Sequence, residues 1–338
     1  MIADRVLLDD WHAVARSDEV YGDRLVGRVL LEEDIVLWRS AEGLRAWQDR
    51  CPHRGAKLSL GQVRGPDRLG CPYHGWQFDP AGRCRTMPAA PGAAPPGKAV
   101  VKGYRVAEAH GLVWVSLGDP PAGPPDLAGS DADYELVVTG PYAIATSGPR
   151  AIENFLDMAH FAFVHRGWLG AEPHTEIPDY AVEADASGVT VRNFRVWQPR
   201  SNALSEGGDM VEYSYRVTRP LTALLTKEPG AAGGKPAEII MITVAPQAET
   251  MVTAWFVLAM TYARGQPHRR FVDFQDAIFL QDKAVLESQR PQRLPLDPAA
   301  EQHQLCDRSS LAYRRWLQQL GLTYGVIPAK RRVRDSQA

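Results

Sequence analysis

Two cysteines and two histidines in the first quarter of the chain have the types and the spacing of metal ligands. They are Cys51, His53, Cys71 and His74, which form a Cys-x-His pair, a gap of seventeen residues and a Cys-x-x-His pair. Each pair places one thiolate and one imidazole in a short loop, so two facing loops offer two sulfurs and two ring nitrogens to one site. A [2Fe–2S] centre in which two histidines replace two cysteines on one iron needs this mixed set.

A tetrahedral zinc ion accepts the same ligand types and is the alternative. Zinc modules commonly pair cysteine with cysteine and histidine with histidine, whereas both pairs here are mixed. Pro52 and Pro72 stiffen the two loops, and Gly55 and Gly75 allow tight turns that bring backbone N–H groups toward bridging sulfides. Spacing and loop composition therefore favour the iron–sulfur cluster over zinc.

A second set of candidate ligands lies in residues 150–168, RAIENFLDMAHFAFVHRGW. Asn154, Asp157 and His160 follow one another at intervals of three, which on a helix places them near one face. His165 comes five residues after His160, and this spacing predicts that the helix ends or bends between the two histidines. Two imidazoles and one carboxylate form a facial triad that leaves positions open for O2 on ferrous iron.

The carboxylate of such a triad must come from another part of the chain. Residues 271–291 have helical periodicity and contain three candidates, Asp273, Asp276 and Asp282. Each of them can equally be a solvated charge on a helix face, so residue types alone leave the choice open.

The segments CPHRGA and CPYHGW resemble the ligand loops of the Rieske non-haem iron oxygenases. Neither loop has the additional cysteine of the respiratory Rieske proteins, which indicates the low-potential type. The later segment LQDKAVLESQRP resembles the helix that completes the iron triad in the monooxygenase branch of the family, and this resemblance selects Asp282. The chain is most similar to the single-subunit-type terminal oxygenases, such as the vanillate, dicamba and caffeine demethylases.

The resemblance also implies roles for two polar residues. Asp157 matches the carboxylate that bridges one histidine of each centre across a head-to-tail homotrimer, so that the cluster of one subunit reduces the iron of the next. Which of His53 and His74 contacts it stays open. Asn154 matches a position near the iron.

The implied reaction is hydroxylation of a C–H bond of a small aromatic or heteroaromatic substrate by O2, with N- or O-demethylation as one outcome. Electrons from NADH or NADPH would come through a separate ferredoxin or flavin-containing reductase, because no strand is followed by the G-x-G-x-x-G pattern of a nicotinamide site. The alternatives are hydroxylation of a ring or alicyclic carbon, or cis-dihydroxylation. A different class, an electron carrier or ligand-binding protein without a working mononuclear iron, also remains open.

Composition limits the other possibilities. The 338 residues are 45% hydrophobic and 23% charged, with a net charge of −2, which is typical of a globular protein with two domains and of no nucleic-acid partner. The longest apolar run, residues 251–263, is too short to span a membrane, and the first residues do not have the pattern of a secretory signal. Cys84 and Cys306 are expected to be free thiols, so we expect a cytoplasmic protein.

The elements that must position these ligands follow from the hydrophobic pattern. Alternation over residues 25–48 predicts an antiparallel meander, and we expect residues 1–120 to form an all-β Rieske domain. A Pro/Gly-rich crossing at 121–133 leads to a catalytic domain at 134–338, for an α+β chain overall. The resemblance implies that this second domain is a helix-grip fold, in which a curved antiparallel sheet surrounds a long helix. We further expect a flexible loop at 220–236, an amphipathic helix at 312–322 and a solvated tail beginning AKRRVR.

Overall fold

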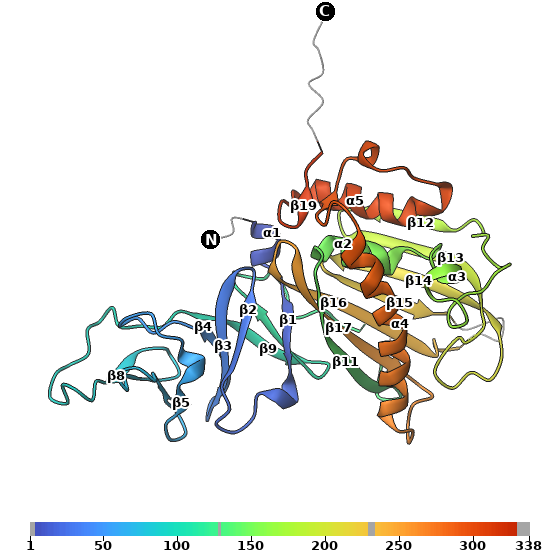
Figure 1. Cartoon of the computed structure of the whole chain (residues 1–338). Helices are drawn as coiled ribbons and strands as arrows, with labels where there is room; N and C mark the ends of the chain where they lie inside the picture. The colour runs from blue at the N-terminus through green and yellow to red at the C-terminus, as the bar shows by residue number, and fades with distance from the viewer. Residues whose placement is uncertain (1–3, 128–129, 229–233, 330–338) are drawn as a thin grey trace, which may run out of the picture. The chain divides into compact units, whose positions relative to one another are not determined.

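The computed structural model describes residues 4–127, 130–228 and 234–329 (Figure 1). The chain divides into two compact units, of which the first comprises Met1–Pro125 with Ala245–Ala248 and the second comprises Asp126–Val244 with Glu249–Ala338.

The first unit contains two antiparallel sheets. The larger has the strand order β1-β10-β9-β4-β3-β2 and the smaller the order β5-β6-β7-β8. The strands of the larger sheet are β1 His12–Arg16, β2 Val26–Leu30, β3 Glu33–Ser40, β4 Gly43–Gln48, β9 Gly103–Ala109 and β10 Leu112–Ser116. Those of the smaller sheet are β5 Gln62–Val63, β6 Leu69–Gly70, β7 Gln77–Phe78 and β8 Cys84–Thr86, and the short helices are α1 Arg5–Leu8, η1 Ser17–Glu19 and η2 Leu58–Leu60. The consecutive pairing of β2, β3 and β4 confirms the predicted meander.

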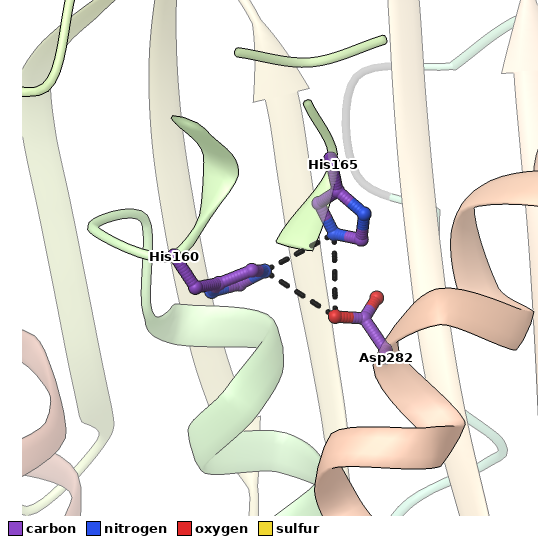
Figure 2. A group of neighbouring side chains, drawn as sticks. All are labelled: His160, His165 and Asp282. Atoms are coloured by element: carbon purple, nitrogen blue, oxygen red, sulfur yellow. Dashed lines mark hydrogen bonds and ion pairs between the residues drawn. The ribbon is translucent and has the colours of Figure 1, made fainter. Parts of the chain in front are cut away.

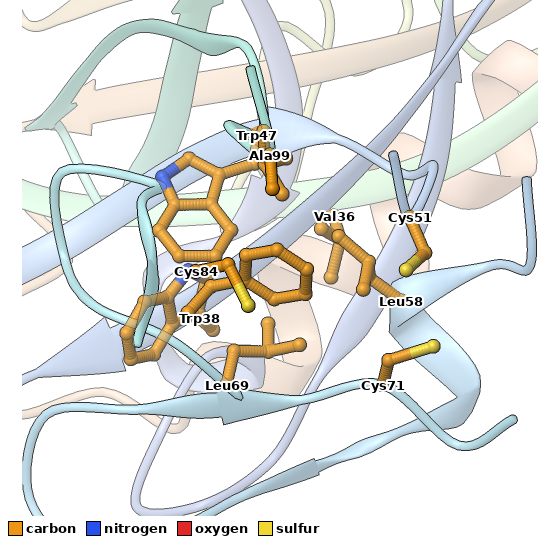
Figure 3. Packing of buried hydrophobic residues seen from close by; sticks show 11 residues of the cluster. Val36, Trp38, Trp47, Cys51, Leu58, Leu69, Cys71, Cys84 and Ala99 are labelled. Carbon is orange, nitrogen blue, oxygen red and sulfur yellow. The ribbon is translucent and has the colours of Figure 1, made fainter. Parts of the chain in front are cut away.

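An apolar core supports the two cysteine-containing loops of this unit. Trp38 and Trp47 pack edge to face with their ring centroids 4.9 Å apart, and Phe78 is completely buried in the same cluster. Cys51 and Cys71 lie at one side of this cluster, with their sulfurs on two separate loops (Figure 3). The loops that carry the candidate cluster ligands are therefore anchored by burial of their own cysteines.

The second unit is built on one seven-stranded sheet in the order β11-β17-β16-β15-β14-β13-β12. Its strands are β11 Glu135–Ile144, β12 Ala181–Asp185, β13 Gly188–Gln198, β14 Asp209–Arg219, β15 Thr222–Lys227, β16 Glu238–Ala248 and β17 Met251–Met260. The helices are α2 Gly148–Leu156, α3 Phe161–Val164, α4 His268–Ser288 and α5 Arg308–Leu320, with η3 Pro298–Ala300 and η4 Leu305–Asp307. A short parallel pair joins β18 Leu294–Pro295 to β19 Val326–Ile327.

Helix α4 lies against the face of this sheet (Figure 1). Its buried side chains recur every three or four residues, as expected for one face of a helix packed on a sheet. They are Phe271, Gln275, Ile278, Phe279, Asp282 and Leu286. The structure thus confirms the predicted α+β organisation, with an all-β first domain followed by a curved sheet that holds a long helix.

The helix before the two histidines ends earlier than its spacing predicted. Helix α2 stops at Leu156, where Asp157 has an extended backbone and its Oδ1 accepts a hydrogen bond from the Ala159 N–H at 2.9 Å. A carboxylate that binds the backbone two residues later competes with the helix. The expectation of one helical face for Asn154, Asp157 and His160 was therefore wrong, because the break precedes both histidines.

The prediction of a flexible loop over residues 220–236 was also wrong in part. Thr222–Lys227 forms strand β15, which pairs with both β14 and β16. The Gly/Pro cluster after the strand obscured its short apolar run. Residues 229–233, and the predicted tail from Lys330 onward, lie outside the described residues.

A buried group of two arginines and two glutamates joins α2 to α5. Arg314 on α5 donates from Nε to Glu153 Oε1 on α2 at 2.5 Å, and Arg150 on α2 donates from Nη2 to Glu301 Oε1 at 2.5 Å. Both arginine side chains are only 3% exposed. The charges of the group cancel, which is the condition under which buried ions are tolerated.

The Arg314→Met variant should lose about 3 kcal/mol or more of unfolding free energy, because it leaves a buried carboxylate partly uncompensated. Urea denaturation followed by circular dichroism measures this loss. The matched control is Arg308→Met, which removes an exposed pair with Asp179 and should change stability far less. Equal losses of unfolding free energy in the two variants would contradict the conclusion that this buried group stabilises the contact between α2 and α5.

Candidate metal centres and their cavity

The two cysteine-containing loops close with the same backbone hydrogen bonds. In each loop a glycine N–H donates to the carbonyl of the cysteine four residues before it, at 2.9 Å for Gly55 to Cys51 and 3.1 Å for Gly75 to Cys71. Both glycines have left-handed backbone angles, with φ of 75° and 66°. Glycine adopts this conformation without steric cost, so both loops turn tightly enough to present their side chains on one side.

The side chains of these loops lie close together. The rings of His53 and His74 are 4.5 Å apart, and His53 stacks on Trp76 at 4.4 Å. His53 Nδ1 is buried without a hydrogen-bond partner among the described residues, which leaves this nitrogen available to a metal. Burial raises the pKa of the Cys51 thiol to about 11, beside the thiol of Cys71, so a bound cation is needed to hold it as thiolate.

These four residues fit a [2Fe–2S] cluster better than a single zinc ion. The ligand atoms of a tetrahedral zinc site lie within about 4 Å of one another, given bonds of 2.0–2.3 Å. Within the described ranges, no three ligand atoms of Cys51, His53, Cys71 and His74 come together within 4.8 Å. A cluster of two irons accepts this wider separation.

The second centre is compact. His160 and His165, at the two ends of α3, and Asp282 of α4 point toward one another (Figure 2). The Nε2 atoms of the two histidines are 3.1 Å apart. Asp282 Oδ1 lies 3.3 Å from His160 Nε2 and 3.2 Å from His165 Nε2. Three ligand bonds of about 2.1 Å to one ion impose separations close to these. The structure thus brings together three residues that the sequence placed in two distant segments.

Each imidazole is oriented through its other ring nitrogen. His160 Nδ1 lies 3.2 Å from Asp157 Oδ2, and His165 Nδ1 lies 2.9 Å from Gln281 Oε1. Both Nε2 atoms are thereby left for a metal, and the acceptors increase the basicity of the rings. Sequence reasoning missed Gln281, since an amide is not a metal-ligating type and its only signal was its place beside Asp282.

The carboxylate of Asp282 lies between the two imidazole rings. Burial opposes its ionisation, but the hydrogen bonds from His160 and His165 lower its pKa to about 2. Burial likewise disfavours the charged form of His160, but its contacts with two carboxylates raise its pKa to about 9. Asn154 Nδ2 donates to Asp282 Oδ1 at 3.3 Å and so fixes the carboxylate from a third side.

The other two candidate carboxylates lie elsewhere on α4. Asp273 pairs with Arg269 at 2.6 Å on an exposed part of the helix, and Asp276 accepts a hydrogen bond of 2.5 Å from the hydroxyl of Tyr142. Neither belongs to the compact group of three ligands.

A cavity of about 810 Å³, counted with its opening to solvent, lies between α4 and the sheet and reaches the three ligands. Its walls are mostly apolar because alternate residues of β16 and β17 face inward. The apolar lining includes Ile240, Ile242, Phe256, Leu258, Phe274 and Ile278. A cavity with this lining is suited to a largely apolar molecule.

Comparison with known proteins assigns each part of the chain to a known domain family. Residues 10–105 match the Rieske [2Fe-2S] domain family, and residues 144–323 match the Vanillate O-demethylase oxygenase C-terminal domain family. Methylxanthine N1-demethylase NdmA of Pseudomonas putida is 33% identical over 294 residues, which cover 86% of this chain and 81% of NdmA. A segment of 119 residues, 35% of this chain and 20% of the relative, is 37% identical to the oxidoreductase NdmD of the same organism.

The fold is also found among solved structures. That of Pseudomonas putida CBB5 NdmA with caffeine superposes with a TM-score of 0.79 and 30% identity, over 93% of this chain and 90% of that one. In the described part of the chain, no helix is both long and apolar enough to cross a membrane.

The Asp282→Ala variant should keep the visible absorption of the cluster while losing the mononuclear iron and turnover, because it removes one of three ligands. Iron analysis and absorption spectra of the purified protein measure both effects. Asp276→Ala is the control and should retain the iron. Loss of iron in the control variant instead would show that the wrong carboxylate was chosen.

The Gln281→Leu variant should weaken ferrous-iron binding about 10- to 100-fold, because His165 loses the partner that orients its ring. Titration of iron-depleted protein with Fe(II) measures the affinity. Gln319→Leu, an exposed change on α5, serves as the control. An unchanged affinity in Gln281→Leu would mean that packing alone orients His165.

Proposed function

This chain belongs to the Rieske terminal oxygenases that carry a vanillate O-demethylase type of C-terminal domain, and we propose that it demethylates a small aromatic or heteroaromatic substrate. The observation that carries the proposal is the group His160, His165 and Asp282 at the wall of a largely apolar cavity. An N- or O-linked methyl group placed beside these ligands is the part of the substrate that would be hydroxylated.

The two metal centres have separate tasks. When bound, the cluster at Cys51, His53, Cys71 and His74 supplies single electrons, and ferrous iron at His160, His165 and Asp282 supplies the activation of O2. Asp157 and Gln281 hold the two imidazoles in the orientation that a ligand needs, and Asn154 holds the carboxylate. The apolar walls position the substrate and exclude water from the reacting carbon.

The overall reaction balances with an external source of electrons. One oxygen atom enters the methyl C–H bond and the other leaves as water, which consumes an electron pair and two protons for each O2. The hydroxymethyl group then breaks its bond to nitrogen or oxygen and leaves as formaldehyde, with a proton returned to the heteroatom. A separate reductase that uses NADH or NADPH would provide the electrons, and the relationship to the oxidoreductase NdmD supports such a partner.

We also propose that the active form is a head-to-tail homotrimer in the cytoplasm. Asp157 supports this arrangement, because its side chain remains 36% exposed while it contacts His160. A carboxylate so placed can accept a second imidazole N–H from the cluster loops of a neighbouring copy. This bridge would connect the two metal centres between subunits.

Anaerobically purified protein should contain three irons and two sulfides per chain, and dithionite should elicit the rhombic paramagnetic resonance signal of a Rieske cluster. With a reductase and NADH, a methylated substrate should yield formaldehyde in proportion to the O2 consumed. If the product is a diol or a ring-hydroxylated compound instead, the enzyme catalyses a different oxygenation and the proposal of demethylation is wrong. Zinc without the resonance signal, or only two irons per chain, would exclude an oxygenase.

A further inference from the structure

One end of the cavity carries polar side chains across neighbouring strands. Tyr213 of β14 pairs in register with Lys227 of β15, and Lys227 pairs in register with Glu238 of β16. Tyr262, just beyond β17, donates its hydroxyl hydrogen bond to Glu238 Oε2 at 2.9 Å. All four side chains line the cavity, and we call them the polar row.

The Tyr262 end of the polar row lies away from Asp282, whereas the ring of Tyr213 is 6.5 Å from that of Phe161, the residue after His160. The ring of Tyr262 is 6.1 Å from that of Phe271, near the beginning of α4. Asp282 follows Phe271 by eleven residues on the same helix, which corresponds to about 16 Å along its axis. A substrate whose methyl group lies at the iron site would therefore meet the Tyr262 end of the polar row with its opposite end.

The ion pair within the row is buried. Lys227 and Glu238 form a salt bridge with side-chain exposures of only 12% and 7%. Replacement of such a pair by apolar residues is often neutral for stability. The next positions on the same strands, Leu225 and Ile240, are in register and apolar, so the cavity wall does not require charge here. Fold stability alone gives no reason for the pair.

The row offers one unused donor beside one unused acceptor. The Lys227 ammonium has three N–H groups, and the contacts of the described residues use two, to Ser201 O and Glu238 Oε2. Glu238 Oε2 accepts from both Lys227 and Tyr262, whereas its Oε1 accepts from no described residue. Tyr213 donates to Gln198 Oε1 at 2.8 Å, so its proton is already engaged.

We infer that the polar row is the specificity subsite for a neutral amide edge of the substrate, in which a ring N–H stands next to a C=O. The substrate carbonyl accepts from Lys227 Nζ, and the substrate N–H donates to Glu238 Oε1. This inference rests on the proposed function, since it describes how the same cavity selects its substrate.

Charge balance selects a neutral edge over a carboxylate. The positive charge of Lys227 is already neutralised by Glu238, so a carboxylate would bring an uncompensated negative charge into a buried site. A neutral amide edge satisfies the donor and the acceptor together and leaves the row neutral.

Anaerobic binding to the reduced holoenzyme tests the subsite without turnover. Two pairs of probes differ only at the ring nitrogen. Theobromine and 2-pyridone carry the N–H group, and their partners caffeine and N-methyl-2-pyridone carry a methyl group in its place. Vanillate serves as the carboxylate probe. In the wild-type protein at least one N–H probe should bind about tenfold or more tightly than its N-methyl partner, since a buried acceptor is left unpaired by the latter. Vanillate should bind more weakly than that N–H probe.

The Lys227→Met/Glu238→Leu double variant should retain both metal centres and bind the two members of each pair equally. Glu238→Gln, which is closer in shape, leaves Lys227 without its counter-charge and should strengthen vanillate binding about tenfold. Arg192→Met/Glu183→Leu is the matched control, because it removes an exposed ion pair between β12 and β13 outside the cavity.

The inference is overturned if no N–H probe is preferred by the wild-type protein, or if the preference survives in the double variant. It is also overturned if the variants change the association rates of both members of a pair equally. Lys227, Glu238 and Tyr262 also line a second pocket at the surface, and equal changes would mean that the polar row controls ligand entry from that pocket. Formaldehyde production judges the proposed function separately, because the binding measurements contain no O2.

Discussion

A buried carboxylate between two imidazoles is the constraint on which the catalytic unit depends. Asp282 is only 8% exposed, and its charge is tolerated there because His160 and His165 meet it. The histidines precede it by more than a hundred residues, so α4 must pack against the segment around α3 before the site exists. Packing of the helix on the sheet and assembly of the ligands are therefore one event.

The histidine segment meets this constraint by being divided into short pieces. Asp157 ends α2 by binding the backbone of Ala159, and its other oxygen orients His160. A continuous helix would separate the two histidines by five residues, about half a turn out of phase. The short helix α3 instead begins after one histidine and ends before the other, so both rings reach the same point. The buried ions that join α2 to α5 fix the position from which this break begins.

The sequence was most informative where the chemistry requires particular residue types. Mixed Cys/His pairs and period-two strands predicted the first domain, and the helical repeat of residues 271–291 predicted α4. The break at Asp157 was placed too late, because a carboxylate that caps a helix and one on its surface look alike in a sequence. Gln281 and Lys227 were missed for another reason, since their roles depend on strand register and on which helix face is buried, and neither can be read without the fold.

The cavity combines two modes of selection that differ in strength. Apolar walls distinguish ligands mainly by size. A ligand that lacks one methylene group loses little binding free energy in such a cavity. Buried polar groups distinguish more sharply, because a ligand that cannot pair with them leaves their desolvation uncompensated. Apart from the three candidate iron ligands, Lys227 and Glu238 are the residues of the described cavity lining that have ionisable acidic or basic side chains. The reacting carbon then needs no polar recognition of its own, and the region around the iron can remain dry while orientation is set by these two residues.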